Sequence, residues 1–223
     1  MPRIILVDDH PLVLTGIKNW LEVHSRFTVA HLAKTFEESL LLEDKLQKTA
    51  DSVSPSYQDF IAIVDISLKK ASPFGLSGGT EENQGFEIIR RFTALGIPCI
   101  AFSSHDSGGF VERAMSEEIG AKGFVSKNAD ELILLAAINS VANGGTYVQA
   151  ELVTDFLEVR DISHTFTRKE KEVADAITLH NSNADVAAAL GISEKTVVNY
   201  LSMLYDKAGV QNKTQFLEKM GRL

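Results

Sequence analysis

The sequence holds little cysteine, little proline and no long apolar run. Its 223 residues include one cysteine, Cys99, which excludes an intramolecular disulfide and a cysteine-based metal site. The longest purely apolar run, Leu132 to Ile138, is far shorter than the ~20 residues needed to cross a bilayer. The N-terminus also lacks the apolar core of a signal peptide. We therefore expect a cytoplasmic protein with no membrane contact, in which Cys99 is a small buried hydrophobe.

Basic residues are outnumbered, because 22 Lys and Arg against 30 Asp and Glu give a formal net charge of −8. Such a balance argues against a protein coated in nucleic acid. The acidic excess lies within residues 1–160, since residues 161–223 carry eight basic and eight acidic side chains. This mild asymmetry does not by itself identify a DNA-binding segment.

Up to about residue 143, short apolar runs alternate with amphipathic stretches. The expected strands are Ile4–Val7, Phe27–Leu32, Phe60–Val64, Pro98–Phe102 and Gly123–Val125, and the expected helices are about 12–23, 36–48, 84–94, 109–118 and 130–142. Five strand–helix units predict an α/β, doubly wound, five-stranded parallel sheet with helices on both faces.

Local signals mark several boundaries in this first part of the chain. Pro11 and the pair Asn128–Glu131 indicate helix starts, and Gly144-Gly145 indicates a stop. Two stretches, 49–59 and 69–84, are long for loops in such a fold. The second is glycine-rich but lacks the Gly-Lys-Ser/Thr ending of a phosphate-binding loop, so we predict no nucleotide site there.

The last part of the chain shows no strand pattern. Residues 146–160 are apolar-patterned, which fits a helix or a docking linker, and four helices follow at about 167–179, 183–190, 193–208 and 214–220. Thr167 with Glu170 forms a capping-box pattern, while Gly191 and Ser193 indicate a tight turn before a longer helix. Together they predict a small all-α helix-turn-helix domain whose second helix enters a major groove. A helical bundle for protein contacts remains the alternative.

Three carboxylates follow expected parallel strands: Asp8 and Asp9 after the first, and Asp65 after the third. Ligand sites of open α/β sheets lie at this edge, and clustered carboxylates there suit Mg²⁺. Ser103 and Lys127 follow the fourth and fifth strands. A nucleophilic carboxylate, a metal, a cation and a hydroxyl are the parts needed for phosphoryl transfer. The alternative is that each Asp merely caps a helix.

Residues 1 to about 145 resemble a response-regulator receiver domain. The matching segments are Ile-Leu-Val-Asp-Asp-His-Pro-Leu-Val from Ile5, Ile-Val-Asp-Ile-Ser-Leu from Ile63, Ala-Phe-Ser-Ser-His-Asp from Ala101 and Gly-Ala-Lys-Gly-Phe-Val-Ser-Lys from Gly120. The resemblance implies that a histidine kinase phosphorylates Asp65, and that Asp8, Asp9 and Asp65 hold Mg²⁺. It also implies that Ser103 and Lys127 bind the phosphoryl group and that Phe124 reorients with the switch. Ser67 and His105 would tune the phosphoryl lifetime, and His10 would have no separate role.

The chain departs from this pattern beside the phospho-acceptor strand. The usual Met-Pro is Leu68-Lys69, and the glycine that normally follows the Asp closely is Gly85, which implies an insertion. An aspartate-based phosphatase is a further alternative, but its second carboxylate would stand where this chain has Ser67.

The C-terminal segment resembles the LuxR-type domain, and the whole chain resembles the NarL/FixJ class. The resemblance is carried by Thr-Arg-Lys-Glu-Lys-Glu-Val, Asn-Ala-Asp-Val-Ala, Ile-Ser-Glu-Lys-Thr-Val and Leu-Tyr-Asp-Lys-Ala-Gly-Val. It implies DNA contacts from Lys195, Thr196, Val197 and Asn199, and phosphate contacts from Lys207, Lys213, Arg168 and Lys169. Val198 and Tyr200 stand where the class usually has Lys and His, which predicts weaker or altered DNA binding.

These resemblances imply a receiver domain at 1–145, a linker at 146–163 and a DNA-binding domain at 164–223. We expect a transcriptional response regulator, not an enzyme, whose phosphorylation frees the helix-turn-helix or creates a homodimer on promoter DNA. Phe216, Leu217 and Met220 form either a dimer surface or part of the core. The rival hypothesis is an atypical receiver whose C-terminal domain binds a protein partner.

Overall fold

The structure, a computed structural model, describes residues 2–50, 59–68 and 84–222. It contains two compact units, a first unit of residues 1–106 with 114–150 and a second unit of residues 107–113 with 151–223. Most of the two predicted long loops, 49–59 and 69–84, falls outside the described residues. Within the described ranges, no helix has the length and apolar character needed to span a bilayer.

A fully parallel sheet of order β2-β1-β3-β4-β5-β6 forms the first unit. Its strands are β1 (Arg3–Val7), β2 (Val29–Ala33), β3 (Phe60–Asp65), β4 (Cys99–Ser103), β5 (Gly123–Ser126) and β6 (Tyr147–Val148). The predicted parallel α/β architecture is confirmed, with one correction to the strand count. The sixth strand was not expected, because two residues are too few to show a strand periodicity.

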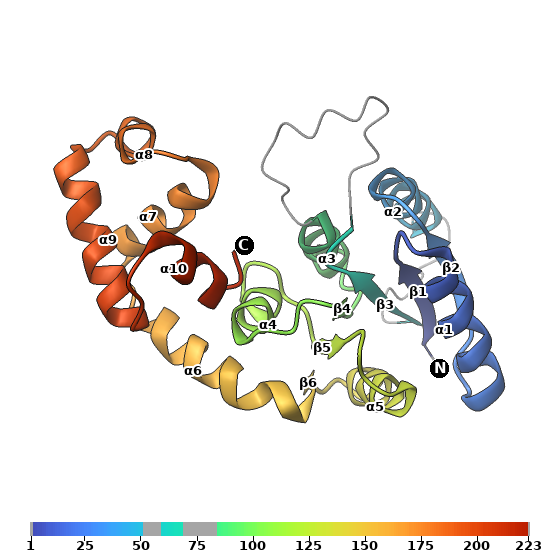
Figure 1. Ribbon diagram of the computed structural model, residues 1–223. Helices are drawn as coiled ribbons and strands as arrows, with labels where there is room; N and C mark the ends of the chain where they lie inside the picture. Colours follow the sequence, from blue (N-terminus) through green and yellow to red (C-terminus); the bar gives the residue numbers. More distant parts are fainter. Residues whose placement is uncertain (1, 51–58, 69–83, 223) are drawn as a thin grey trace. The chain divides into compact units, whose positions relative to one another are not determined.

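Helices cover both faces of the sheet (Figure 1). The helices of the first unit are α1 (Pro11–His24), α2 (Phe36–Ala50), α3 (Gln84–Ala94) and α5 (Glu131–Ala142), whereas α4 (Gly108–Met115) falls mostly within the second unit. Leu14 and Leu21 of α1 share one buried cluster with Ile138 of α5 and with Ile4 and Ile63 of the sheet. Helices α1 and α5 therefore cover one face, and α2 and α3 lie on the other (Figure 1).

The predicted helix boundaries hold with two differences. Pro11 is the first residue of α1, as expected. The cap of α5 is Asp130, whose carboxylate accepts a hydrogen bond from Leu132 N at 2.8 Å, and not Asn128. The reason is that Glu131 is the first residue of the helix, so it cannot stand at the third position of a capping box. Helix α4 ends at Met115, three residues earlier than predicted.

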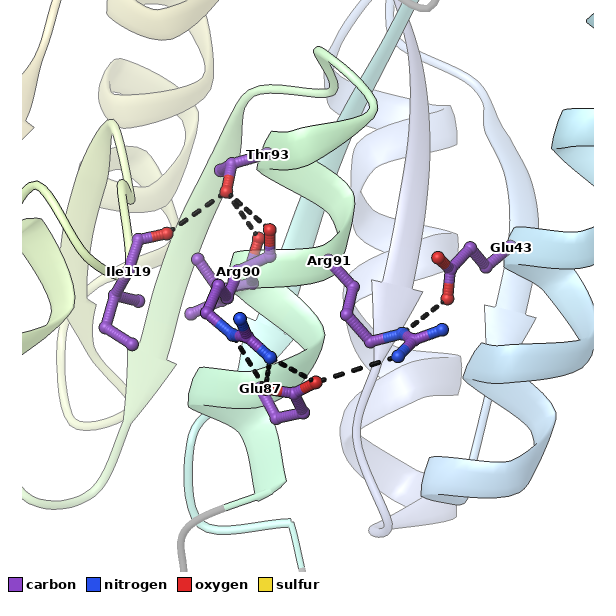
Figure 2. A network of polar contacts seen from close by, with 7 residues as sticks. Glu43, Glu87, Arg90, Arg91, Thr93 and Ile119 are labelled. Carbon is purple, nitrogen blue, oxygen red and sulfur yellow. Dashed lines mark hydrogen bonds and ion pairs between the residues drawn. The ribbon is translucent and has the colours of Figure 1, made fainter.

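Polar contacts tie α3 to its neighbours (Figure 2). Arg91 Nε donates to Glu43 Oε2 of α2 at 2.6 Å, and Glu87 accepts from Arg90 one turn along the same helix. The Thr93 hydroxyl donates to the carbonyl of Ile119 at 3.1 Å (Figure 2). These contacts fix the position of α3, whose first turn lies beside the end of β3.

The single cysteine lies inside the first unit. Cys99 has no exposed surface, and its thiol donates to the carbonyl of Ile97 at 3.4 Å. Burial raises the pKa of the Cys99 thiol. The expectation of a small buried hydrophobe is confirmed.

Helices form the second unit around their own core. Besides most of α4, they are α6 (Val153–His164), α7 (Arg168–Leu179), α8 (Asn183–Leu190), α9 (Glu194–Ala208) and α10 (Lys213–Lys219), after the 3₁₀ turn η2 (Ala150–Leu152). The predicted capping box joins Thr167 and Glu170, and Gly191 takes the left-handed conformation at φ 65°. Phe216, Leu217 and Met220 belong to the buried cluster. The core interpretation of these three residues is therefore correct, and the dimer-surface interpretation is wrong.

Candidate functional site

The acidic residues meet at the point where the strand order reverses. Strand β1 lies between β2 and β3. The chain therefore adds β2 on one side of β1 and the later strands on the other side. Asp8 and Asp9 follow β1, and Asp65 ends β3. Ligand atoms of Asp8, Asp9, His10 and Asp65 all lie within 4.8 Å of one another. Open α/β sheets bind their ligands at such a switch point.

Lys127, directly after β5, supplies the positive charge of this cluster. Its Nζ lies 2.7 Å from Asp8 Oδ2 and 2.8 Å from Asp65 Oδ2. Burial works to lower the pKa of Lys127, but hydrogen bonds and charge from Asp65 and Asp8 raise it above its usual value. Burial raises the pKa of the Asp65 carboxyl, against the opposing effect of Lys127. The lysine is therefore held in its charged form between two buried carboxyl groups.

Three carboxylates meet at this site, and the one lysine contacts two of them, Asp8 and Asp65. Asp8 Oδ2, Asp9 Oδ1 and Asp65 Oδ2 are buried, and among the described residues their contacts are ion pairs, with Lys127 for Asp8 and Asp65 and with His10 for Asp9. Buried carboxylate oxygens need a cation or a donor. The cluster thus offers the oxygen ligands that a hard divalent cation such as Mg²⁺ prefers.

A hydroxyl group and an imidazole border the same edge. Ser103 ends β4, has no exposed surface, and accepts a hydrogen bond from His105 N at 2.9 Å. Ser67 N donates to Asp65 Oδ1 at 2.8 Å, and Ser67 Oγ lies 3.1 Å from His105 Nδ1. This Ser67–His105 contact joins the residues after β3 and β4. The resemblance placed both residues at this edge, but their contact, across 38 positions, was not predicted.

Gly85 brings α3 against strand β3. A Cβ atom at this position would lie 2.1 Å from the carbonyl oxygen of Asp65 and 2.3 Å from the Cα of Ile66. A glycine is therefore required for α3 to begin here. On the far side of the site, Phe124 of β5 is fully buried.

In the second unit, α8, Gly191 and α9 form the predicted helix-turn-helix. Ser193 caps α9 by accepting from Thr196 N at 3.1 Å, which starts the second helix directly after the turn. Lys195 and Asn199 are exposed on α9, and Thr196 is half-buried. Val197 has no exposed surface, so its side chain supports the helix from within and is not available to a base edge. Its neighbour Val198 is 50% exposed.

Two lysines expected at DNA phosphates have partners inside the domain. Lys207 Nζ lies 2.7 Å from both carboxylate oxygens of Glu170, which has no exposed surface, and also donates to the carbonyl of Thr165. Lys213 Nζ donates to the carbonyl of His180 at 2.8 Å, beyond the end of α7. Both ammonium groups therefore stabilise the fold.

Glu170 is the residue that the sequence interpretation placed only as a cap. Burial works to raise the pKa of Glu170, but hydrogen bonds from Lys207 and Thr167 lower it below its usual value. Arg168 and Lys169, also expected at phosphates, both contact Glu172 on the exposed side of α7. These contacts leave Lys195 as the candidate cation on the exposed surface of α9.

Known proteins resemble this chain over both units. Residues 164–220 match the family model described as bacterial regulatory proteins, luxR family. UhpA of Salmonella typhimurium is 28% identical over 228 residues, covering 99% of this chain and 98% of that protein. DegU of Brevibacillus brevis is 26% identical over 235 residues, covering 96% and 90%. Both relatives are transcriptional regulatory proteins rather than enzymes.

Solved structures share the fold. RcsB of Salmonella enterica serovar Typhimurium, bound to promoter P1flhDC with the phosphomimetic BeF3−, matches with a TM-score of 0.64 at 20% identity over 99% of this chain and 98% of that one. A structure of two RcsB dimers on two parallel DNAs gives 0.64 at 19% identity, covering 100% and 98%. At such identities the match establishes the fold alone.

Proposed function

The chain belongs to the NarL/FixJ (LuxR-type) class of two-component response regulators, and from this premise we propose that phosphorylation of Asp65 controls DNA binding by the helix-turn-helix. Class membership makes the chain a transcription regulator with a LuxR-type DNA-binding domain. To this we add that Asp65 accepts the phosphoryl group, that a histidine kinase donates it, and that phosphorylation promotes DNA binding. The observation that carries it is the contact of Lys127 Nζ with both Asp8 and Asp65 at the switch point of the sheet.

The proposed chemistry is transfer of a phosphoryl group from a kinase phosphohistidine to Asp65. One Asp65 carboxylate oxygen attacks phosphorus, the bond between phosphorus and imidazole nitrogen breaks, and an acyl phosphate forms. Lys127 neutralises charge on the phosphoryl oxygens, and the Ser103 hydroxyl donates to one of them. Asp8, Asp9 and Asp65 would hold Mg²⁺, which supplies further charge neutralisation when bound.

On the DNA side, the proposal uses the exposed surface of α9. Lys195, Thr196 and Asn199 reach base edges or phosphates near the start of the helix, while Val197 packs beneath them. Affinity from phosphate contacts is modest, because residues 161–223 have no net charge and Lys207 and Lys213 have partners of their own. A phosphorylation-dependent homodimer on paired half-sites would double the number of contacts.

The test is selection of genomic DNA fragments by the full chain with and without a beryllofluoride phosphoryl mimic. Asp65→Asn removes the acceptor, and Asp44→Asn makes the same chemical change on the exposed surface of α2. We expect the mimic to enrich a paired half-site sequence with the wild-type chain and with Asp44→Asn, and not with Asp65→Asn. Mimic binding without DNA enrichment in any state would instead assign the C-terminal domain to a protein partner.

A further inference from the structure

The side chain of Gln149 continues the sheet where the sixth strand stops. Backbone pairing between β5 and β6 joins Phe124 to Val148, and Gln149 N then donates to the carbonyl of Phe124 at 3.3 Å. The next donor along β5, Ser126 N, is satisfied by the side-chain Oε1 of Gln149 at 3.0 Å. An amide side chain thus replaces the missing backbone carbonyl of a longer strand.

This hydrogen bond is buried at both ends. Ser126 is 1% exposed and Gln149 is 9% exposed. A buried N–H group left without an acceptor costs about 1–3 kcal/mol, so the contact constrains where residue 149 can lie. Gln149 is also the last residue before η2, where the chain leaves the sheet.

Ser126 connects this contact to the phosphorylation site. It directly precedes Lys127, whose own backbone N donates to the carbonyl of Ser103 at 2.7 Å. The Ser126 hydroxyl donates to Asp106 Oδ2 at 3.1 Å, in the loop after Ser103, and accepts from Asn128 N at 3.2 Å. Three segments therefore meet at Ser126. They are the turn with Lys127, the loop after β4, and residues 149–152, the connector through which the chain leaves the sheet.

A phosphoryl group on Asp65 would alter contacts of Lys127, next to this junction. Lys127 Nζ now contacts carboxylate oxygens of both Asp8 and Asp65, and an added phosphoryl group on Asp65 must change at least one of these contacts. The backbone at residues 126 and 127 is held by Gln149 on one side and by Ser103 on the other. A shift of Lys127 toward the phosphoryl oxygens would therefore pull on backbone that the Ser126–Gln149 hydrogen bond holds.

We propose that Gln149 is a positioning residue that couples the Lys127 end of β5 to the connector at residues 149–152. The inference rests on the proposed phosphorylation of Asp65. Gln149 touches neither the phosphoryl group nor DNA, and it acts through Ser126. If the Oε1 acceptor of Gln149 is removed, a conformational change at Asp65 should no longer reach residues 149–152.

The test compares Gln149→Met, which keeps the side-chain length and removes the acceptor, with Gln149→Glu, which keeps an acceptor. Gln47→Met makes the same change on an exposed position of α2. The full-length variants are titrated with beryllofluoride in the presence of Mg²⁺, and hydrogen exchange is followed at residues 123–128 and 147–152. The mimic-dependent gain in DNA affinity is the second measurement.

We expect Gln149→Met to bind the mimic within about twofold of wild type, because no ligand of the site changes. Its mimic-dependent change in exchange at 147–152 should be lost, and its gain in DNA affinity should fall about fivefold, the equivalent of one hydrogen bond. Gln149→Glu should retain most of both responses, and Gln47→Met all of them.

An unchanged exchange response in Gln149→Met, or no response at 147–152 in the wild-type chain, would overturn the coupling. If the mimic does not change the DNA affinity of the wild-type chain, the proposed function is contradicted instead. The hydrogen-exchange measurements at residues 147–152 then still test the coupling. Should Gln149→Met fail to fold, Gln149→Asn withdraws the acceptor by one methylene and is held to the same outcomes.

Discussion

Gly85 lies against the backbone of Asp65 so closely that a Cβ atom would stand 2.1 Å from the Asp65 carbonyl oxygen. Strand β3 and the first turn of α3 therefore share one close backbone contact. It explains why the glycine is needed there despite the long segment that separates it from Asp65 in the sequence.

Replacing this glycine should disturb the site and the fold together. Gly85→Ala forces α3 away from β3, an overpacking change that costs roughly 1–3 kcal/mol. We expect a lower urea midpoint for the first unit and at least a severalfold weaker binding of beryllofluoride. Gly16→Ala, on α1 where a Cβ meets nothing within 4 Å, is the matched control. Equal mimic binding by the two variants would contradict the importance of this contact.

The buried Glu170 makes the second unit sensitive to acid. Its pKa in the folded chain lies below the ordinary value of 4.5, so the charged form is favoured by folding. The resulting stability is fully present above pH 4.5 and is lost as the pH falls through the lowered pKa. Thermal unfolding between pH 6 and pH 3 should show this loss for the wild-type chain. Glu170→Gln should be less stable near pH 6 and show a smaller acid-dependent decrease; a decrease of the same size would exclude this role for Glu170.

Lys195 and Lys207 should have opposite effects when each is replaced by methionine. Lys195→Met removes an exposed cation, so the slope of log affinity against log salt should fall by about 0.9 while stability stays unchanged. Lys207→Met leaves Glu170 buried without its cation and should lower stability by about 2 kcal/mol. Urea unfolding and DNA titration at several salt concentrations measure both effects. If Lys207→Met is as stable as wild type and shows a reduced salt slope, Lys207 contacts DNA phosphates after all.

Val198 offers a gain-of-function test on the exposed surface of α9. Val198→Lys adds a cation where the class usually has one, so DNA affinity should rise and the salt slope should steepen by about 0.9. Leu179→Lys, at the end of α7 where the leucine is 52% exposed, controls for a general increase in charge. Equal gains from both lysines would mean that the effect is nonspecific.

The gathering of Asp8, Asp65, Ser103 and Lys127 could be predicted, because one rule governs it. The carboxyl ends of parallel strands share an edge, so residues that end successive strands meet there whatever their separation in sequence. The helix-turn-helix could be predicted for a similar reason, since Thr167, Ser193 and Gly191 act on backbone groups within a few residues of themselves.

Contacts between distant side chains follow no such rule. Glu170 and Lys207 are 37 positions apart, and nothing local in α9 shows that this lysine turns inward rather than toward solvent. Gln149 accepts from a backbone N–H 23 positions earlier, at the end of a strand too short to be predicted. Val197 and Val198 are chemically identical, so only the packing of α9 decides which of them is buried.

The burial of Cys99 gives the chain a practical property. A thiol with no exposed surface and a raised pKa is scarcely ionised at neutral pH, and the thiolate is the form that reacts with maleimides and oxidants. Wild-type protein should therefore stay unmodified by such reagents while folded. One cysteine placed at an exposed position in each unit would then take a pair of fluorescent or spin labels without competition. The native sequence is thus already suited to distance measurements between the two units as a phosphoryl mimic is added.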